Sequence, residues 1–330
     1  MAATAPTQAQ QATTAARSRR RREALEGYLF LLPNILGFLI FMAIPLVLSL
    51  YYAFTDWDLL TPPEFIGLQN FVEALGFTMG PRGLQPNDPI FWRSLGNTFM
   101  YALGVIAFAV LPAFILAYLL NSKLRGMAFF RGLYYLPVVA SVVAIALVYL
   151  WIFDAESGAI NFILGLFASV INGIFGTEIP KPTIGWLTSP QWALLSLVIM
   201  TAWRLIGYDM VIFLAALQGV PNSLNEAALV DGASRTTILR KIIVPLITPT
   251  IFFILVTNLI EVLQVFAEPY IMTRGGPANS TLTLVMYLYQ KGFQRYQMGY
   301  ASALAWLAFG IIFAITTVQF RVSKRWVVED

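Results

Sequence analysis

Residues 28–54, YLFLLPNILGFLIFMAIPLVLSLYYAF, contain no charged side chain. A helix needs about 20 consecutive apolar residues to cross the hydrocarbon core of a bilayer, so this stretch is long enough to span a membrane. The whole chain is also rich in apolar residues and poor in charged ones: 58% of the 330 residues are hydrophobic and 12% are charged. A soluble domain carries about 25% charged residues, so this composition predicts a membrane protein.

Five more segments have a similar length and composition: residues 95–120, 132–153, 192–216, 242–266 and 301–320. The sequence therefore predicts an all-α, polytopic membrane protein with six transmembrane helices. Residues 160–175 are also apolar, but they are shorter and are interrupted by Gly165, Asn172 and Gly173. We interpret them as an outer-face or re-entrant segment.

The distribution of Lys and Arg predicts the orientation, because cytoplasmic loops of membrane proteins are enriched in both. Basic residues cluster before the first span, in the second and fourth loops and after the last span: Arg17, Arg19, Arg20, Arg21, Arg22, Lys123, Arg125, Arg131, Arg235, Arg240, Lys241, Arg321, Lys324 and Arg325. The first loop, residues 55–94, has two basic residues and five acidic ones. Both termini are therefore predicted to be cytoplasmic, although three basic residues in the fifth loop fit this pattern less well.

We divide the chain into a disordered basic cytoplasmic arm (residues 1–27), a transmembrane domain (28–320) and a cytoplasmic tail (321–330). After Met1, residues 2–16 are Ala, Thr, Gln and Pro, a composition typical of disorder. A cleaved secretory signal is the alternative for the start, since a basic region precedes an apolar one. The apolar run is too long for such a signal and no clear cleavage site follows it, which favours an uncleaved span.

Several kinds of chemistry are excluded by composition. The chain contains no His and no Cys, which excludes thiol nucleophiles, Cys/His zinc sites, histidine acid–base catalysis and disulfides. It also lacks the Gly-x-x-x-x-Gly-Lys-Ser/Thr pattern that cradles nucleotide phosphates. We therefore expect no catalytic residue, metal site or cofactor, and any ATP must be bound by another chain. The net charge of +4 comes from basic clusters between spans and does not indicate a nucleic-acid partner.

The fourth loop and the start of the fifth span, residues 221–245, have the sequence PNSLNEAALVDGASRTTILRKIIVP. Pro221 suits a first helical turn, residues 226–233 predict a short helix, and an Asp-Gly pair closes it. A second helix is expected from about Ser234 into the fifth span. Small residues give this helix pair a low profile, which suits a groove on another protein. The alternative is a helix that lies on the membrane surface.

A motif with defined spacing runs through this loop. It consists of Glu226-Ala227-Ala228, then three residues and Gly232, then nine residues and Ile242, followed by Val244-Pro245. The pattern resembles the signature of the membrane permease subunits of binding-protein-dependent ABC importers, in which Leu-Pro usually stands where this chain has Val-Pro. Other motifs resemble the maltose and glycerol-3-phosphate branch: residues 65–71 (FIGLQNF), 97–98 (NT), 130–131 (FR), 136–137 (LP), 213–218 (FLAALQ) and 273–277 (TRGGP). The resemblance covers about residues 28–320.

The resemblance implies that the coupling loop, about residues 221–241, inserts into a cleft of a cytoplasmic ATPase. Closure of the ATPase would then switch the spans between inward-facing and outward-facing states. Glu226 would make the polar contact, and Gly232 would permit the turn between the two helices. The other residues of this set are Ala227, Ala228, Asp231, Ala233 and Pro245. The simpler alternatives are a solvated carboxylate for Glu226 and an ordinary helix cap for Gly232.

The same resemblance implies a multi-pass subunit of the cytoplasmic (inner) membrane that has no ATPase site of its own. Its expected partners are a second homologous permease, a cytoplasmic ATPase dimer, an extracytoplasmic solute-binding protein and membrane lipid. The expected function is to form half of the translocation pathway for a sugar, oligosaccharide or related polyol. A glycerol-phosphate-type importer and an ion-gradient-driven secondary carrier are the alternatives. A carrier would leave the motif loop without a role.

Polar residues inside spans usually face a cavity or another helix. In the fifth span Asn258, Glu261 and Gln264 recur every three residues, so they lie along one side of a helix. We predict that this stripe lines the translocation pathway, and hydrogen bonding between helices is the alternative.

The fourth span contains two charged residues, Arg204 and Asp209. Their spacing places them about 140° apart on an ideal helix, so they do not face each other unless Gly207 breaks the helix. We assign neither residue a role toward the solute, and the two alternatives are partners on other helices and a cytoplasmic extension of the span. Because Arg204 is the one basic residue within the spans, a neutral solute is favoured over a phosphate-bearing one.

Overall fold

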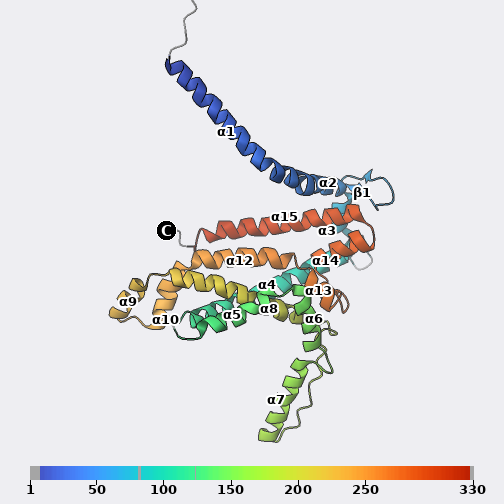
Figure 1. The fold of residues 1–330 in the computed structure, drawn as a ribbon. Helices are drawn as coiled ribbons and strands as arrows, with labels where there is room; N and C mark the ends of the chain where they lie inside the picture. The colour runs from blue at the N-terminus through green and yellow to red at the C-terminus, as the bar shows by residue number, and fades with distance from the viewer. Residues whose placement is uncertain (1–7, 81–82, 123, 328–330) are drawn as a thin grey trace, which may run out of the picture.

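The computed structural model describes residues 8–80, 83–122 and 124–327 (Figure 1). Its α-helices are α1 (Gln8–Phe38), α2 (Ile44–Tyr52), α3 (Gln69–Leu75), α4 (Pro89–Leu120), α5 (Met127–Val139), α6 (Val142–Ile152), α7 (Ala159–Phe175), α8 (Ala193–Gly219), α9 (Asn222–Val230), α10 (Arg235–Ile238), α11 (Val244–Leu246), α12 (Thr248–Leu263), α13 (Ala267–Met272), α14 (Leu284–Tyr289) and α15 (Met298–Ser323). Three π-helical segments join some of them: η1 (Leu39–Ala43), η2 (Leu239–Ile243) and η3 (Gln290–Gln294). The predicted helical fold is confirmed.

The loop between the first two spans adds two small antiparallel sheets, which the all-α prediction did not include. Strand β1 (Thr55–Asp56) pairs with β2 (Glu64–Phe65), and β3 (Phe77–Gly80) pairs with β4 (Gly83–Pro86). The buried amide of Asn70 donates hydrogen bonds to the backbone oxygens of Ala53 and Thr55, so α3 is fixed to the end of the first span.

Five described helical segments are long and apolar enough to cross a membrane: Glu23–Tyr52, Pro89–Leu120, Ala193–Gly219, Thr248–Met272 and Met298–Ser323. The predicted third span, residues 132–153, is instead two helices, α5 and α6, bent by 99°. The bend arises because the backbone is extended at Ala140 and Ser141, which follow Pro137 by three and four residues. A count of six spans therefore requires that this bent pair crosses the membrane as one.

The N-terminal arm differs from its prediction. Helix α1 begins at Gln8 and continues to Phe38, so the predicted disorder of residues 1–27 is wrong from Gln8 onward; residues 1–7 lie outside the described residues. Residues 8–26 contain neither Gly nor Pro and are rich in Ala, Gln, Arg and Glu, which all favour helix. The low hydrophobicity of residues 8–26 is therefore compatible with a helix.

The centre of the bundle is the packing of α4 against α8 (Figure 1). On α4 the contact is made by small side chains, and Ala102, Ala109, Ala113 and Ala117 are at most 1% exposed. Small residues let membrane helices approach closely, which increases van der Waals contact where no hydrophobic driving force acts between helices. Larger side chains such as Leu197, Leu205 and Phe213 on α8 fill the layer around them.

A buried carboxylate joins three helices at the end of the bundle that holds α3 and α14. Asp88 caps α4, since its Oδ1 accepts hydrogen bonds from the N–H groups of Ile90 and Phe91 at 2.9 and 3.0 Å. Its Oδ2 accepts hydrogen bonds from the hydroxyls of Tyr287 and Tyr300, each at 2.6 Å. Burial raises the pKa of Asp88, but these hydrogen bonds outweigh burial and hold the pKa below its ordinary value.

We expect the Asp88→Asn substitution to lower the free energy of unfolding by about 2–3 kcal/mol, because two hydroxyls lose a charged acceptor. Since the folded-state pKa is depressed, the ionised carboxylate stabilises the protein above the unfolded pKa of about 4. That stabilisation is lost as pH falls through the folded-state pKa.

Thermal unfolding of the detergent-solubilised protein between pH 7 and pH 3 tests this expectation. The variant should start from a lower Tm at pH 7 and lose less on acidification. Asp58→Asn is the control, because the Asp58 carboxylate also accepts backbone and hydroxyl hydrogen bonds, but these bonds are exposed to solvent. An equal acid-induced loss in wild type and Asp88→Asn would contradict the assignment.

Candidate functional site: the α9–α10 loop and an intramembrane cavity

Helices α9 and α10 lie at one end of the bundle, opposite the end that holds α3, α13 and α14 (Figure 1). The start of α1 and the end of α15 lie toward the same side as α9. Pro221 precedes α9 as its N-cap, so the short helix spans Asn222–Val230 and not residues 226–233. Glu226 therefore lies in the middle of α9 and not at its start.

An Asp-Gly turn closes α9 as predicted. Gly232 has φ of +79°, a left-handed conformation that costs an L-residue roughly 1–2 kcal/mol. The N–H of Ala233 donates to the carbonyl of Ala228 at 2.9 Å, and the N–H of Gly232 donates to that of Leu229 at 3.1 Å. This pattern is a glycine C-cap, so Gly232 fits both the predicted turn and the ordinary helix cap.

The two sides of the coupling loop differ in exposure. Ala228 and Ala233 pack against the buried cluster that contains Leu217 and Ile238, which attaches α9 to α8 and α10. Glu226, Ala227, Asp231 and Gly232 are exposed. Three apolar side chains are also exposed, namely Leu224 at 42%, Leu229 at 55% and Val230 at 88%. The sequence analysis did not single out these three residues. Apolar side chains on a short, exposed helix are nevertheless a sign of a protein partner.

Ser234 starts the second helix, where its Oγ accepts a hydrogen bond from the N–H of Thr237 at 3.2 Å. The predicted continuous helix from there into the fifth span is interrupted, because η2, α11 and a break at Ile247 precede α12. Segment η2 ends two residues before Pro245, as η1 ends two residues before Pro45. A proline lacks an N–H and its ring crowds the preceding turn, and one π-helical turn relieves both effects.

A cavity of about 340 Å³ opens beside the fifth span. Glu261 and Gln264 from α12 and its C-cap line it, together with Arg204 of α8 and Glu268 of α13. Nη2 of Arg204 lies 2.6 Å from Oε1 of Glu261 and 4.0 Å from Oε1 of Glu268. Tyr101 and Thr201 form the adjacent wall, and the Tyr101 hydroxyl donates to Oγ1 of Thr201 at 2.7 Å.

The predicted polar stripe is divided between two environments. Glu261 faces the cavity with 49% of its side chain exposed, and Gln264 is exposed with its amide bonded to the backbone oxygen of Ile260. Asn258 does not line the cavity, because it is 1% exposed and its amide donates to Oδ2 of Asp209 at 2.7 Å. The hydrogen-bonding alternative therefore describes Asn258.

The structure also gives Arg204 a different place from the one we expected. Helix α8 runs through Gly207 without a break, so Arg204 and Asp209 do not pair. Each has a partner on α12, which is the first of the two alternatives. Arg204 nevertheless lines the cavity, as do Glu268, Tyr101 and Thr201, which sequence reasoning missed. For Arg204 the sequence did offer a signal, because a charged residue inside a span usually faces a cavity or the interior of the bundle.

The chain was compared with known proteins. The family model described as the binding-protein-dependent transport system inner membrane component matches residues 109–328. The probable ABC transporter permease protein YesP of Bacillus subtilis is 39% identical over 312 residues, which cover 93% of each chain. The lactose transport system permease protein LacF of Rhizobium radiobacter is 34% identical over 322 residues, 95% of this chain and 99% of LacF.

Among solved structures, a bacterial ABC transporter involved in the import of the acidic polysaccharide alginate has a chain with the same fold. The TM-score is 0.74 at 24% identity, over 94% of this chain and 99% of that one. The predictions of the family, of a mostly helical membrane fold and of an inner-membrane location are confirmed. The chain therefore belongs to the family of inner membrane components of binding-protein-dependent transport systems, and it is a permease subunit of an ABC importer.

Proposed function

We propose that this permease subunit forms half of the translocation pathway of an ATP-driven importer of neutral sugars or oligosaccharides. The exposed α9–α10 loop is the observation that carries the proposal. It presents the carboxylates of Glu226 and Asp231 and three apolar side chains at one end of the bundle, while Ala228 and Ala233 attach it to the core. A surface of this kind suits a protein partner that is itself the ATPase, because this chain contains no phosphate-binding loop.

The contacts of the loop suggest how motion of the ATPase reaches the spans. Force on α9 passes through Ala228 to the α8 cluster and through Ala233, Ile238 and Ile243 to the start of the fifth span. The segment from η2 to α12 leads from there to Glu261 beside the cavity. A rigid-body movement of the loop would therefore change the cavity without local unfolding.

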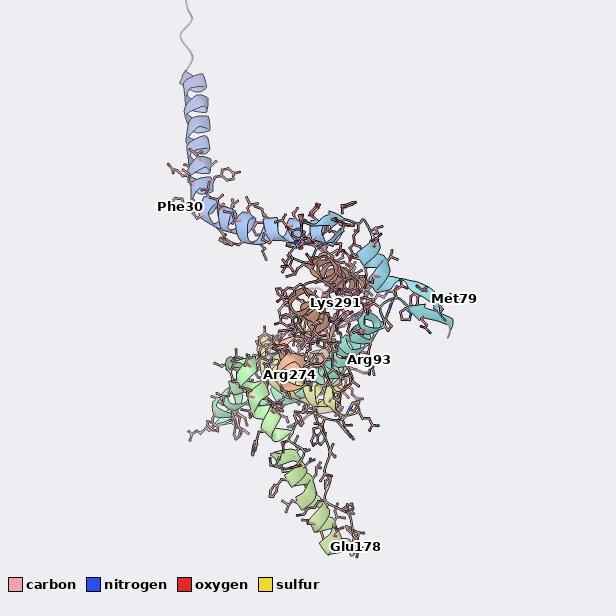
Figure 2. All side chains as sticks on the ribbon, turned by 90° about the vertical axis from the view of Figure 1, so that its right-hand side faces the viewer. Phe30, Met79, Arg93, Glu178, Arg274 and Lys291 are labelled. Atoms are coloured by element: carbon pink, nitrogen blue, oxygen red, sulfur yellow. The ribbon has the colours of Figure 1, made fainter. Side chains whose placement is uncertain are left out.

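A second permease subunit is supported by the first span. In the most apolar 18-residue stretch of Glu23–Tyr52, 0% of the residues are buried by the rest of the chain. The helix leaves the bundle, and Phe30 lies on the part that is separated from the other helices (Figure 2) and is 88% exposed. A homologous subunit that packs on this helix and on the open side of the cavity would complete the pathway.

The charges in the cavity support a neutral solute. Arg204 is neutralised by Glu261 at 2.6 Å, and Glu268 adds a second carboxyl group 4.0 Å from the same guanidinium. The cavity therefore offers no uncompensated positive charge to a phosphate or carboxylate on the solute. Relatives named for lactose transport, for starch degradation products and for multiple sugar binding agree with this chemistry. A glycerol-phosphate-type solute is correspondingly disfavoured.

Co-purification of the tagged chain in mild detergent tests the proposed coupling. We expect an ATPase subunit to be recovered with the wild type and its recovery to fall about tenfold in Glu226→Ala, because a charge-assisted hydrogen bond contributes about 1.5–3 kcal/mol. Glu73→Ala is the matched control, since Glu73 is also an exposed glutamate on a short helix, α3, at the other end of the bundle. Equal recovery in both variants would contradict a coupling role for Glu226.

A further inference from the structure

Helix α7 forms an arm that extends away from the bundle. It begins just after α6 and runs across the direction of α8, α12 and α15 (Figure 1). After α7 ends at Phe175, residues 176–184 return along it toward the bundle. Glu178 marks the far tip of the arm, well away from the other helices (Figure 2).

The arm has a fixed internal structure. Asn161 donates hydrogen bonds to the carbonyls of Ala155 and Ile184 at 2.9 Å and accepts one from the Trp186 indole at 2.9 Å. About three turns farther on, the Asn172 side chain exchanges hydrogen bonds with the backbone of Ile179 at 2.8 and 2.9 Å. The returning segment is therefore bonded to one polar face of α7 at both ends of the helix.

The remaining surface of α7 is apolar and uncovered. Its exposed large side chains are Phe162 (73%), Ile163 (48%), Leu166 (58%), Phe167 (62%), Val170 (50%), Ile171 (40%), Ile174 (69%) and Phe175 (73%). At about 100° per residue these positions cover an arc of roughly 220°, far wider than the roughly 100° stripe of a helix packed on a protein core. Residues 157–177 contain no charged side chain, whereas the returning segment carries Glu178 and Lys181, both exposed.

This apolar surface continues onto the preceding span. Helix α6 contacts α7, and it exposes Leu147, Val148 and Trp151 at 56%, 56% and 60%. Exposed tryptophans at span ends, here Trp151 and Trp192, are typical of the membrane–water interface. The arm therefore starts at interface depth and has an apolar side and a charged side, as an interfacial membrane helix does.

We propose that the α7 arm lies in the outer interface of the bilayer. Its Phe, Ile, Leu and Val side chains insert among the lipid acyl chains, and the returning segment with Glu178 and Lys181 faces water. The arm joins the ends of α6 and α8, so it fixes the depth of both helices in the membrane. The occupant of its apolar face is lipid, and neither the second permease nor the solute-binding protein covers it.

The absence of natural cysteines makes a direct test possible. The Phe167→Cys, Ile174→Cys and Lys181→Cys variants are labelled with a polarity-sensitive fluorophore, and the assembled transporter is placed in phosphatidylcholine/phosphatidylglycerol vesicles. We expect lipids with a doxyl group near the head group to quench the label at 167 and 174 at least threefold more than at 181. Iodide in the outer buffer should show the reverse order. The matched control at Lys181 lies on the water-facing side of the same arm.

Two outcomes would overturn the proposal. If iodide quenches the label at 167 and 174 as strongly as at 181, the apolar face is in water. If neither quencher reaches 167 and 174 in the assembled transporter, a protein subunit covers the face. Two labelled positions keep the test valid when one variant fails to fold, and neither outcome depends on which ATPase drives the transporter.

Discussion

The Gly207→Val substitution is expected to reduce the yield of folded, monodisperse protein at least tenfold. A Cβ atom at Gly207 would lie 2.2 Å from the backbone oxygen of Tyr134 and 3.3 Å from Cγ2 of Val138. Because the obstacle is backbone, α5 and α8 must separate, and overpacking of this kind typically costs about 1–3 kcal/mol or more.

Size-exclusion profiles and thermal unfolding in detergent measure this effect. Gly310→Val is the control, since Gly310 lies in the α15 span and has no atom within 4 Å of its Cβ position. The two variants have the same composition and differ in whether the added side chain meets another helix. Similar yields and Tm values would contradict the close contact between α5 and α8.

The second large effect concerns the cavity, where Arg204→Glu is expected to reduce uptake of the solute at least tenfold. The substitution places three carboxyl groups at positions 204, 261 and 268 with no cation between them. Breaking a partly buried ion pair while leaving its partner in place is strongly destabilising. Arg204→Lys should retain most uptake because the charge stays, although the guanidinium geometry is lost.

Uptake of radiolabelled sugar by vesicles, corrected for the amount of assembled transporter, measures this effect. The control is Arg93→Glu, which changes the same charge on the exposed side of α4 near its start (Figure 2). Uptake by Arg204→Glu at the level of Arg93→Glu would place the cavity outside the pathway.

Local features of the sequence predicted five of the six spans closely and the Asp-Gly turn after α9 correctly. Apolar runs locate helices, and Pro221 and the Asp-Gly pair at 231–232 flank the two ends of α9, although the predicted helix, residues 226–233, started four residues and ended three residues too late. The prediction of disorder for the arm was wrong from Gln8 onward, because polar Ala- and Arg-rich segments satisfy the composition of disorder and the propensities of a helix alike.

The cavity could be predicted only in part. Glu261 and Gln264 were visible as polar residues in a span, but Arg204, the partner of Glu261, lies 57 residues earlier, and Asn258 contacts Asp209 across 49 residues. No local pattern specifies which of these polar groups face each other, since that depends on the rotation of α8 and α12 about their axes. The 99° bend between α5 and α6 is a further feature that the apolar run did not reveal.

The source of energy for uptake tests the central claim most directly. We predict that vesicles with the complete transporter, a solute-binding protein outside and ATP inside accumulate the sugar at least tenfold above vesicles without ATP. Glu226→Ala should abolish this difference, and a proton or sodium gradient alone should drive no uptake. Uptake that follows an ion gradient in the absence of ATP, with or without Glu226, would contradict the account and identify a secondary carrier.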